Sequence, residues 1–358
     1  MPVLLFGSLR NLGRQAVYQC VRGSSFFRLR ENDILSKMPT ETKLNRFAKY
    51  AWLVLGFNVL VILWGVFLRA SKSGDGCGQH WLTCQGEVIP SAPELKTIIE
   101  FSHRITSSMA GILLIVLLVW AFRRWQSQKS EQNRLALWTA LGSFIFVIIE
   151  GLLGAGLVLT GNTAENLTPE RPVWMAAHLI NTFILLAFLT LTARYASGGR
   201  RLNFHVQPKY VFVIAIGVLA IFVVGISGSI AALASMIFPS GTIAEGLARD
   251  FSTTSHMLLR LRLLHPITAI LTSVFLIFLT GWLAKEAGND RRSKRWSNIL
   301  SVLVLAQIAF GSAALLMLAP IVMQLGHLLL ADMLWISYVL FVASFLSPNA
   351  AALDEIVE

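Results

Sequence analysis

Charged residues are scarce in this chain, and acidic residues are the scarcer sign. Of its 358 residues, 14% are charged and 55% are hydrophobic, with a net charge of +11. A soluble globular domain carries about a quarter charged residues, so that class is excluded. In so apolar a chain, basic loops facing the cytoplasm explain the charge better than nucleic-acid binding does, and no nucleic-acid partner is expected. The composition predicts a polytopic protein embedded in membrane lipid.

The first 48 residues lack the apolar core of a secretory signal. Their arginines also fit a transit peptide, but the composition favours a disordered cytoplasmic tail. A second methionine, Met38, marks an alternative start of translation. Cys20, within this tail, is expected to be a free thiol.

Apolar stretches of about twenty residues, the length that spans a bilayer, then recur along the chain. They cover residues 49–69, 98–122, 135–160, 173–194, 209–236, 263–284, 297–318 and 321–346. Lysine and arginine gather in alternate connections, near residues 123–134, 194–209 and 285–295, whereas loops 70–97, 161–172 and 237–262 carry mixed signs. Basic loops face the cytoplasm, so both termini are expected there, in a multi-pass protein of the cell membrane. Pro320 predicts a tight outer turn between the last two spans.

The spans form an internal repeat. The second span begins His103-Arg-Ile-Thr and the sixth His265-Pro-Ile-Thr. The third contains Glu150-Gly-Leu-Leu-Gly154 and the seventh Gln307-Ile-Ala-Phe-Gly311, and the fourth and eighth each carry one histidine. The matches keep the same order, so we expect an all-α fold of two pseudo-symmetric four-helix halves. The halves are residues 49–194 and 209–346, joined by a cytoplasmic linker at 195–208, with a cytoplasmic tail at 347–358.

The repeat places four histidines at one membrane depth. His103 and His178 belong to the first half, and His265 and His327 to the second. A lone histidine in a membrane helix is usually an ordinary polar residue, but four at symmetric positions indicate two pairs of axial haem ligands. Zinc fits less well, because each pair lacks a further ligand.

The halves differ three residues before the first histidine of each pair. Glu100 stands there in the first half and Arg262 in the second. An arginine suits a haem propionate, whereas a carboxylate can accept a proton. The alternative for Glu100 is an interfacial ion pair with Arg104 or Arg69.

The first outer loop holds two cysteines on the side where disulfides form. Cys77 and Cys84 are therefore expected to pair, either as a structural staple or as a dithiol that exchanges electrons. The corresponding loop of the second half contains no cysteine.

Two motifs together resemble the haem A synthase family. They are Gly76-Cys77-x-x-x-Trp81-x-x-Cys84-x-Gly86 and Glu100-Phe-Ser-His103-Arg104, and the resemblance covers about residues 49–346. It implies an eight-helix oxidoreductase that oxidises a methyl group of haem O to the formyl group of haem A, for cytochrome oxidase assembly. It implies His103 and His178 at the substrate haem, His265 and His327 as ligands of a haem b cofactor, and a catalytic Glu100. A haem O synthase and an electron donor are the implied partners. Leu82 follows Trp81 where the family often has proline, which makes the details of substrate loading less transferable.

Two other function classes share some of these features. A dihaem b-type electron-transfer protein needs the four histidines, but not Glu100 or the cysteine pair. A transporter with a parallel repeat fits the duplication and predicts broken helices, for which glycines near residue 154 are a hint. Extracting the bound pigment would separate the three.

Overall fold

The computed structural model describes residues 44–288 and 290–347, and helices dominate them. Eight helical segments of this described part are long and apolar enough to cross a membrane. They are α3 (Arg46–Ala70), α4 (Leu95–Ser127), α5 (Glu131–Leu159), α6 (Arg171–Ala196), α7 (Pro208–Ile237), α9 (Met257–Arg262) with α10 (Leu264–Glu286), α11 (Arg291–Leu316) and α12 (Ile321–Phe345). No strand occurs in these ranges. The predicted all-α fold of a multi-pass membrane protein is confirmed.

Polar caps start several helices before the apolar runs begin. The Asn45 side chain accepts a hydrogen bond from the Ala48 amide, so α3 begins at Arg46 rather than at residue 49. Asp290 caps α11, which begins six residues before the predicted span. The apolar run marks the part of a helix that crosses the bilayer, whereas a cap marks where the helix begins. The remainder of the predicted N-terminal tail, and the C-terminal tail from residue 348, lie outside the described residues.

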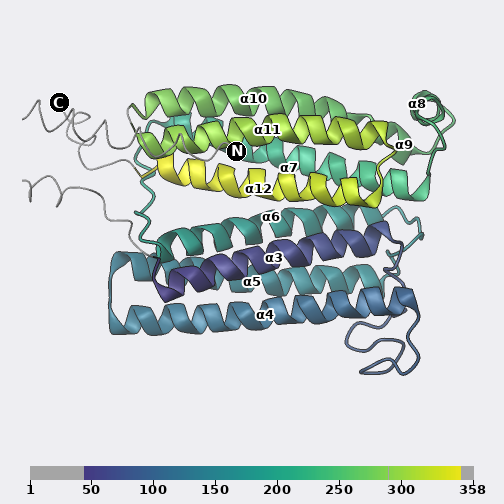
Figure 1. Ribbon diagram of the computed structural model, residues 1–358, viewed down its shortest axis with the longest axis horizontal. Coiled ribbons are helices and arrows are strands. Elements are labelled where there is room, and N and C mark those ends of the chain that lie inside the picture. The colour runs from purple at the N-terminus through teal and green to yellow at the C-terminus, as the bar shows by residue number, and fades with distance from the viewer. Residues whose placement is uncertain (1–43, 289, 348–358) are drawn as a thin grey trace, which may run out of the picture. The chain divides into compact units, whose positions relative to one another are not determined.

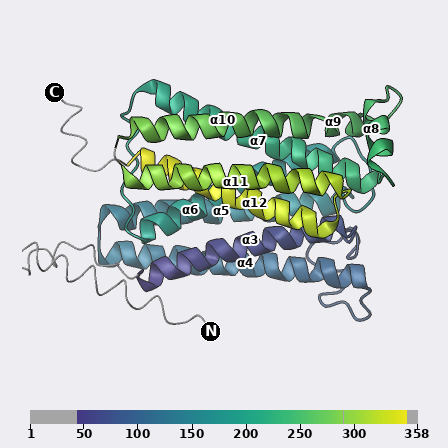
Figure 2. The ribbon, with the colours of Figure 1, turned by 45° about the horizontal axis from the view of Figure 1, so that its top comes forward.

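Helices pack mainly with their neighbours in the chain, in two groups that Figures 1 and 2 show: α3 to α6, and α7 with α10 to α12. This arrangement fits the expected two halves. Helices α6 and α12 join the groups, where the Trp335 indole donates to the Phe183 carbonyl at 2.7 Å and the two ring centroids lie 5.5 Å apart with the planes tilted by 33°. One cluster of buried hydrophobic residues therefore runs through both groups.

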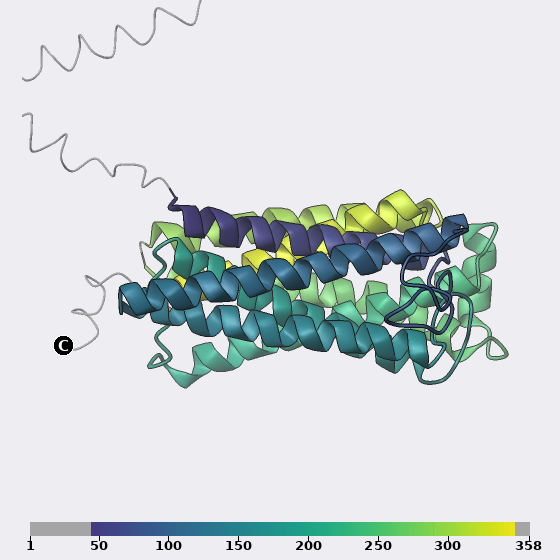
Figure 3. The same cartoon turned by 90° about the horizontal axis from the view of Figure 1, so that it is seen from below.

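One end of the bundle carries loops 71–94, 160–170, 238–256 and 317–320, and we call it the disulfide end (Figure 3). The predicted tight turn at Pro320 is present there, with positive φ at Leu318 and Ala319. The Gln324 amide donates to the Ala319 carbonyl at 2.8 Å and holds the turn. Residues 237–262 are more ordered than a simple loop, because they form α8 (Ile243–Phe251) and α9.

Candidate functional site

Each of the four predicted histidines lies against a glycine of the preceding long helix. A Cβ atom built on these glycines would lie close to the Cε1 atom of the facing imidazole. The distances are 3.0 Å for Gly65 and His103, 3.9 Å for Gly154 and His178, 2.9 Å for Gly228 and His265, and 2.8 Å for Gly311 and His327. A Cβ atom at Gly228 or Gly311 would force the imidazole ring to shift, and one at Gly65 would require the ring to move by a few tenths of an ångström. The helix pairs therefore approach closely where the histidines lie, and this local geometry recurs in both halves.

The histidines of the second half face one another across α10 and α12. The ring centroids of His265 and His327 are 6.2 Å apart, with the ring planes at 86°. Imidazole nitrogens bind a metal ion at about 2.0–2.1 Å, so two axial ligands hold their nitrogens about 4 Å apart. The centroid of each imidazole ring lies one ring radius farther from the metal ion than the binding nitrogen does. The pair therefore has the separation that a single haem iron between the two rings requires.

Hydrogen bonds orient these two rings only in part. Ser227 Oγ lies 3.3 Å from His265 Nδ1 and also contacts Thr268. Gln307 Nε2 lies 3.4 Å from His327 Nε2, while His327 Nδ1 is buried with no partner in the described structure. Buried polar atoms are usually paired, and unpaired ones are characteristic of a site whose ligand supplies the missing contacts.

The histidine pair of the first half lies beside a carboxylate, that of Glu150. His103 and His178 are close enough to interact electrostatically, and the Nδ1 atom of each is buried without a partner among the described residues. Glu150 Oε1 lies 3.5 Å from His178 Nε2. The Glu150 carboxylate also accepts from the Asn181 amide at 2.5 Å and from the Thr182 hydroxyl. The His178 side chain still keeps 36% of its surface accessible.

Sequence reasoning matched Glu150 with Gln307 in the repeat but gave it no role. A glutamate within an apolar span is itself a signal of function. The contact has a chemical consequence, because a carboxylate can only accept hydrogen bonds. It favours the tautomer of His178 that carries hydrogen on Nε2, whereas the amide of Gln307 can donate to the lone pair of His327 Nε2.

No group of three or more His, Cys, Asp or Glu side chains suited to a metal ion occurs among the described residues. The possible ligands come in pairs on facing helices. Two imidazoles across an apolar space suit the two axial positions of a haem iron, since the macrocycle supplies the remaining ligands. The donor set of each pair thus fits a haem.

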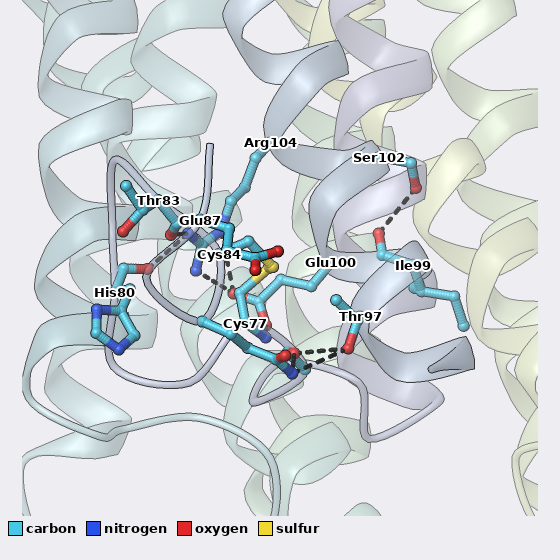
Figure 4. Close-up of a disulfide and its surroundings, with 12 residues drawn as sticks. Cys77, His80, Thr83, Cys84, Glu87, Thr97, Ile99, Glu100, Ser102 and Arg104 are labelled. Atoms are coloured by element: carbon cyan, nitrogen blue, oxygen red, sulfur yellow. Dashed lines mark hydrogen bonds and ion pairs between the residues drawn. A yellow bond between two sulfur atoms is a disulfide. The ribbon is translucent and has the colours of Figure 1, made fainter. Parts of the chain in front are cut away.

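Glu100 is tied to the disulfide loop (Figure 4). Cys77 and Cys84 are bonded, as predicted. The Cys77 amide donates to Glu100 Oε2 at 2.8 Å, and Arg104 donates to Glu100 Oε1 through its Nε at 3.1 Å and through a second nitrogen. Glu100 is only 3% exposed, and both of its oxygens are engaged. The ion pair with Arg104 is the alternative that the sequence left open, while the predicted catalytic role stays a prediction.

Arg104 and the start of α4 hold the rest of this loop. The Arg104 guanidinium donates to the carbonyls of His80 at 2.5 Å, Trp81 at 3.1 Å and Thr83 at 2.9 Å. The Thr97 hydroxyl donates to the Gly76 carbonyl at 2.8 Å. The loop is therefore fixed directly above the first-half histidine pair.

Arg262 binds an acid of its own chain. Its Nη2 atom lies 2.6 Å from Asp250 Oδ1 and its Nε atom 3.1 Å from Oδ2, in a bidentate pair between α9 and α8. Sequence reasoning missed Asp250, because nothing in the linear sequence brings it next to Arg262. The assignment of Arg262 to a propionate stays a prediction.

The sequence of the chain is similar to a protein-family model and to proteins of known name. The model of the COX15-CtaA family, described as cytochrome oxidase assembly protein, matches residues 48–339. A heme A synthase of Alkalihalophilus pseudofirmus is 30% identical over 290 residues, which cover 77% of this chain and 90% of that protein. A heme A synthase of Halalkalibacterium halodurans is 28% identical over 82% of this chain and 94% of that protein.

A longer relative is more similar in sequence. A protoheme IX farnesyltransferase of Thermus thermophilus is 41% identical over 310 residues, 87% of this chain but 50% of that protein. The chain thus spans about half the length of this relative. The match to the family model covers all eight membrane helices, apart from a few terminal residues, and both histidine pairs. The chain belongs to the COX15-CtaA family of cytochrome oxidase assembly proteins.

Proposed function

We propose that the protein is a membrane haem A synthase that oxidises a methyl group of haem O to the formyl group of haem A. The observation that carries the proposal is the pair of neighbouring histidines in each half of a chain that aligns with nearly the full length of proteins named heme A synthase. The first half holds the haem substrate and the second half a resident haem b.

His265 and His327 hold haem b through their imidazole nitrogens, and when bound this group supplies electron transfer. The separation of their rings and the glycines behind them support the assignment. His103 and His178 bind the iron of the substrate. A carboxylate distinguishes the two sites, because α4 carries Glu100 one turn from His103 and the disulfide loop donates a hydrogen bond to it.

Glu100 acts at the edge of the substrate nearest the disulfide end. The conversion is a four-electron oxidation: written with water as the source of the oxygen atom, the methyl group and one water give the formyl group, four protons and four electrons, and the electrons pass to an external acceptor. A buried carboxylate beside the reacting carbon can take up the released proton. Arg104 and the Cys77 amide hold the two oxygens of Glu100 and so fix its position.

The disulfide end faces away from the cytoplasm, and both chain termini lie on the cytoplasmic side of the cell membrane. The basic connections at the opposite end of the bundle support this orientation. A haem O synthase delivers the substrate. This partner is supported by the protoheme IX farnesyltransferase of Thermus thermophilus, because about half of that protein is similar to this chain.

A dihaem electron carrier is the second candidate, because both halves carry a histidine pair that fits a haem. The chain should be expressed with a source of haem O, and the extracted pigments separated. The enzyme yields haem A, whereas the electron carrier yields only haem b.

Glu100→Gln keeps the shape of the side chain and should lower haem A formation about a hundredfold or more, with haem b content unchanged. Thr97→Val is the matched control, since it removes another anchor of the same loop one turn away. If Thr97→Val lowers haem A output as strongly, then Glu100 acts only as a loop anchor. Normal output from Glu100→Gln would refute its role altogether.

A further inference from the structure

Two arginines meet at the disulfide end of the first half without an acidic partner. Arg69 lies in the last turn of α3, and Arg171 is the first residue of α6. Their guanidinium groups are close enough to repel one another. Within the described ranges, neither forms an ion pair with a carboxylate, and the Arg69 guanidinium donates no hydrogen bond. Arg171 is buried and Arg69 half-buried, and two neighbouring cations shielded from water without a counter-ion are unfavourable unless an anion joins them.

Two other arginines at this end, one near each histidine pair, have acidic partners, which makes the contrast informative. Arg104 binds Glu100, and Arg262 binds Asp250. Arg171 uses two nitrogens to hold a loop, donating to the carbonyls of Asn166 at 2.5 Å and Ala164 at 2.7 Å. Its Nε atom remains buried with no partner in the described structure, although the residue is only 2% exposed.

Both arginines lie on the helix faces that carry the histidine pair. Arg171 precedes His178 by seven residues, which is two turns on the same face, about 10 Å along the axis. Arg69 follows Gly65 by four residues, about one turn nearer the disulfide end, and Gly65 packs on His103. A ligand whose iron lies between His103 and His178 would therefore meet both arginines at one edge.

We propose that Arg69 and the Nε of Arg171 bind the propionate carboxylates of the substrate haem. The inference rests on the proposed function, because it takes the first half as the substrate site. Guanidinium groups pair with carboxylates through charge-assisted hydrogen bonds, which are stronger than neutral ones. The repeat places Ala232 and Pro320 at the corresponding positions of the second half, so this anion site belongs to the first half alone.

The site fixes the orientation of the substrate. With its propionates at the disulfide end, the haem stands edge-on in the bundle, and the reacting methyl group, a ring neighbour of a propionate, faces the level of Glu100. Glu100 itself lies one turn from His103 toward the same end. The two arginines thus select the one edge of the macrocycle that the carboxylate can reach.

The test is a haem titration of the purified full chain followed by absorption spectroscopy, with two probes: ferric protohaem IX and its dimethyl ester, which lacks the propionate charges. Arg69→Gln is the variant, because Arg69 holds no structural contact, and Arg69→Lys restores the charge. Arg260→Gln, an exposed arginine on α9, is the matched control. His265→Ala with His327→Ala isolates the first half. If this double variant does not fold, Arg69→Gln is tested in a chain that keeps both second-half histidines. Two haem-binding steps are then expected, and only the step that belongs to the first half should change.

We expect Arg69→Gln to weaken binding of the free-acid haem about tenfold or more, with no change for the ester. Arg69→Lys should recover part of the loss, and Arg260→Gln should bind as the unmodified chain does. Equal weakening for both probes, no weakening for either, or no first-half binding at all would overturn the inference. Haem A output is measured separately: a chain that discriminates between the probes yet makes no haem A refutes the proposed function and leaves the anion site standing.

Discussion

Removing the disulfide should loosen the loop above the first-half histidines without unfolding the bundle. Cys77 and Cys84 are separated by seven positions, so the bond closes a loop of eight residues. On the chain-entropy model, such a closure contributes about 2.5 kcal/mol relative to the open loop. That free energy corresponds to a change of about seventyfold in the equilibrium between the closed and open loop.

Hydrogen exchange at the loop amides measures this equilibrium. Among the amides bonded within the loop, three lie at or beside the disulfide: Gly78 donates to the Asp75 carbonyl, Gln85 to the Cys77 carbonyl and Cys84 to the Glu87 carbonyl. In a Cys77→Ser, Cys84→Ser double variant, their protection should fall by up to about seventyfold. Segment 238–256, the corresponding loop of the second half, should exchange as before and serves as the internal control.

A result in which protection is unchanged would refute the entropic reasoning. It would mean that Arg104, rather than the disulfide, confines the loop through its bonds to three carbonyls and to Glu100. Arg104→Gln with the disulfide intact separates the two, because bonds to a charged donor contribute about 1.5–3 kcal/mol. Whichever variant loosens the loop should also free the Glu100 oxygen that accepts from the Cys77 amide.

Further predictions concern other parts of the chain. Gly311→Ala places a Cβ 2.8 Å from a histidine ring and should lower the amount of haem b bound per protein, whereas Gly281→Ala, with open space around it, should not. Asp332→Leu removes a fully buried carboxylate with no partner in the described structure; it should stabilise the protein by about 1–3 kcal/mol in thermal unfolding, and a loss would indicate a role for the acid. The hydrogen bond from Lys72 lowers the pKa of Glu165, so the pair stabilises loop 160–170 above the ordinary glutamate pKa and loses this effect as the pH falls through the lowered value. At neutral pH, hydrogen exchange of loop 160–170 should therefore be faster in Lys72→Ala than in the unmodified chain, and this difference should vanish in acid. A difference that persists in acid would contradict the assignment.

The membrane helices could be predicted from the sequence because spanning a bilayer demands about twenty apolar residues, whatever the tertiary packing. Helix ends could not, since they depend on caps such as Asn45 and Asp290 that lie outside the apolar runs. The short helices α8 and α9 were also missed. Each is well below the length of a span, and loop 237–262 offers only local polar patterns that fit several conformations.

The repeat singled out the four histidines as a set, and their role as haem ligands stays a prediction. The pairing of Cys77 with Cys84 could be predicted because few cysteines were available. What remained hidden depends on three-dimensional proximity. The partner of Arg262 is twelve residues away on another helix, and Arg69 and Arg171 come together only when α3 packs beside α6. A linear sequence gives the charge of each residue, but it does not reveal which charges are left without a partner.

A duplicated fold can perform two tasks only if its copies differ at the ligands, and the neighbours of the histidines supply that difference. Glu150 favours hydrogen on His178 Nε2, so binding an iron there requires that hydrogen to move. Gln307 can donate to His327 Nε2, so this nitrogen carries a lone pair, and iron binding there would replace only a neutral hydrogen bond. Iron ligation is therefore less hindered in the second half than in the first. That is the direction expected when one half must release its haem after each reaction while the other retains its haem throughout.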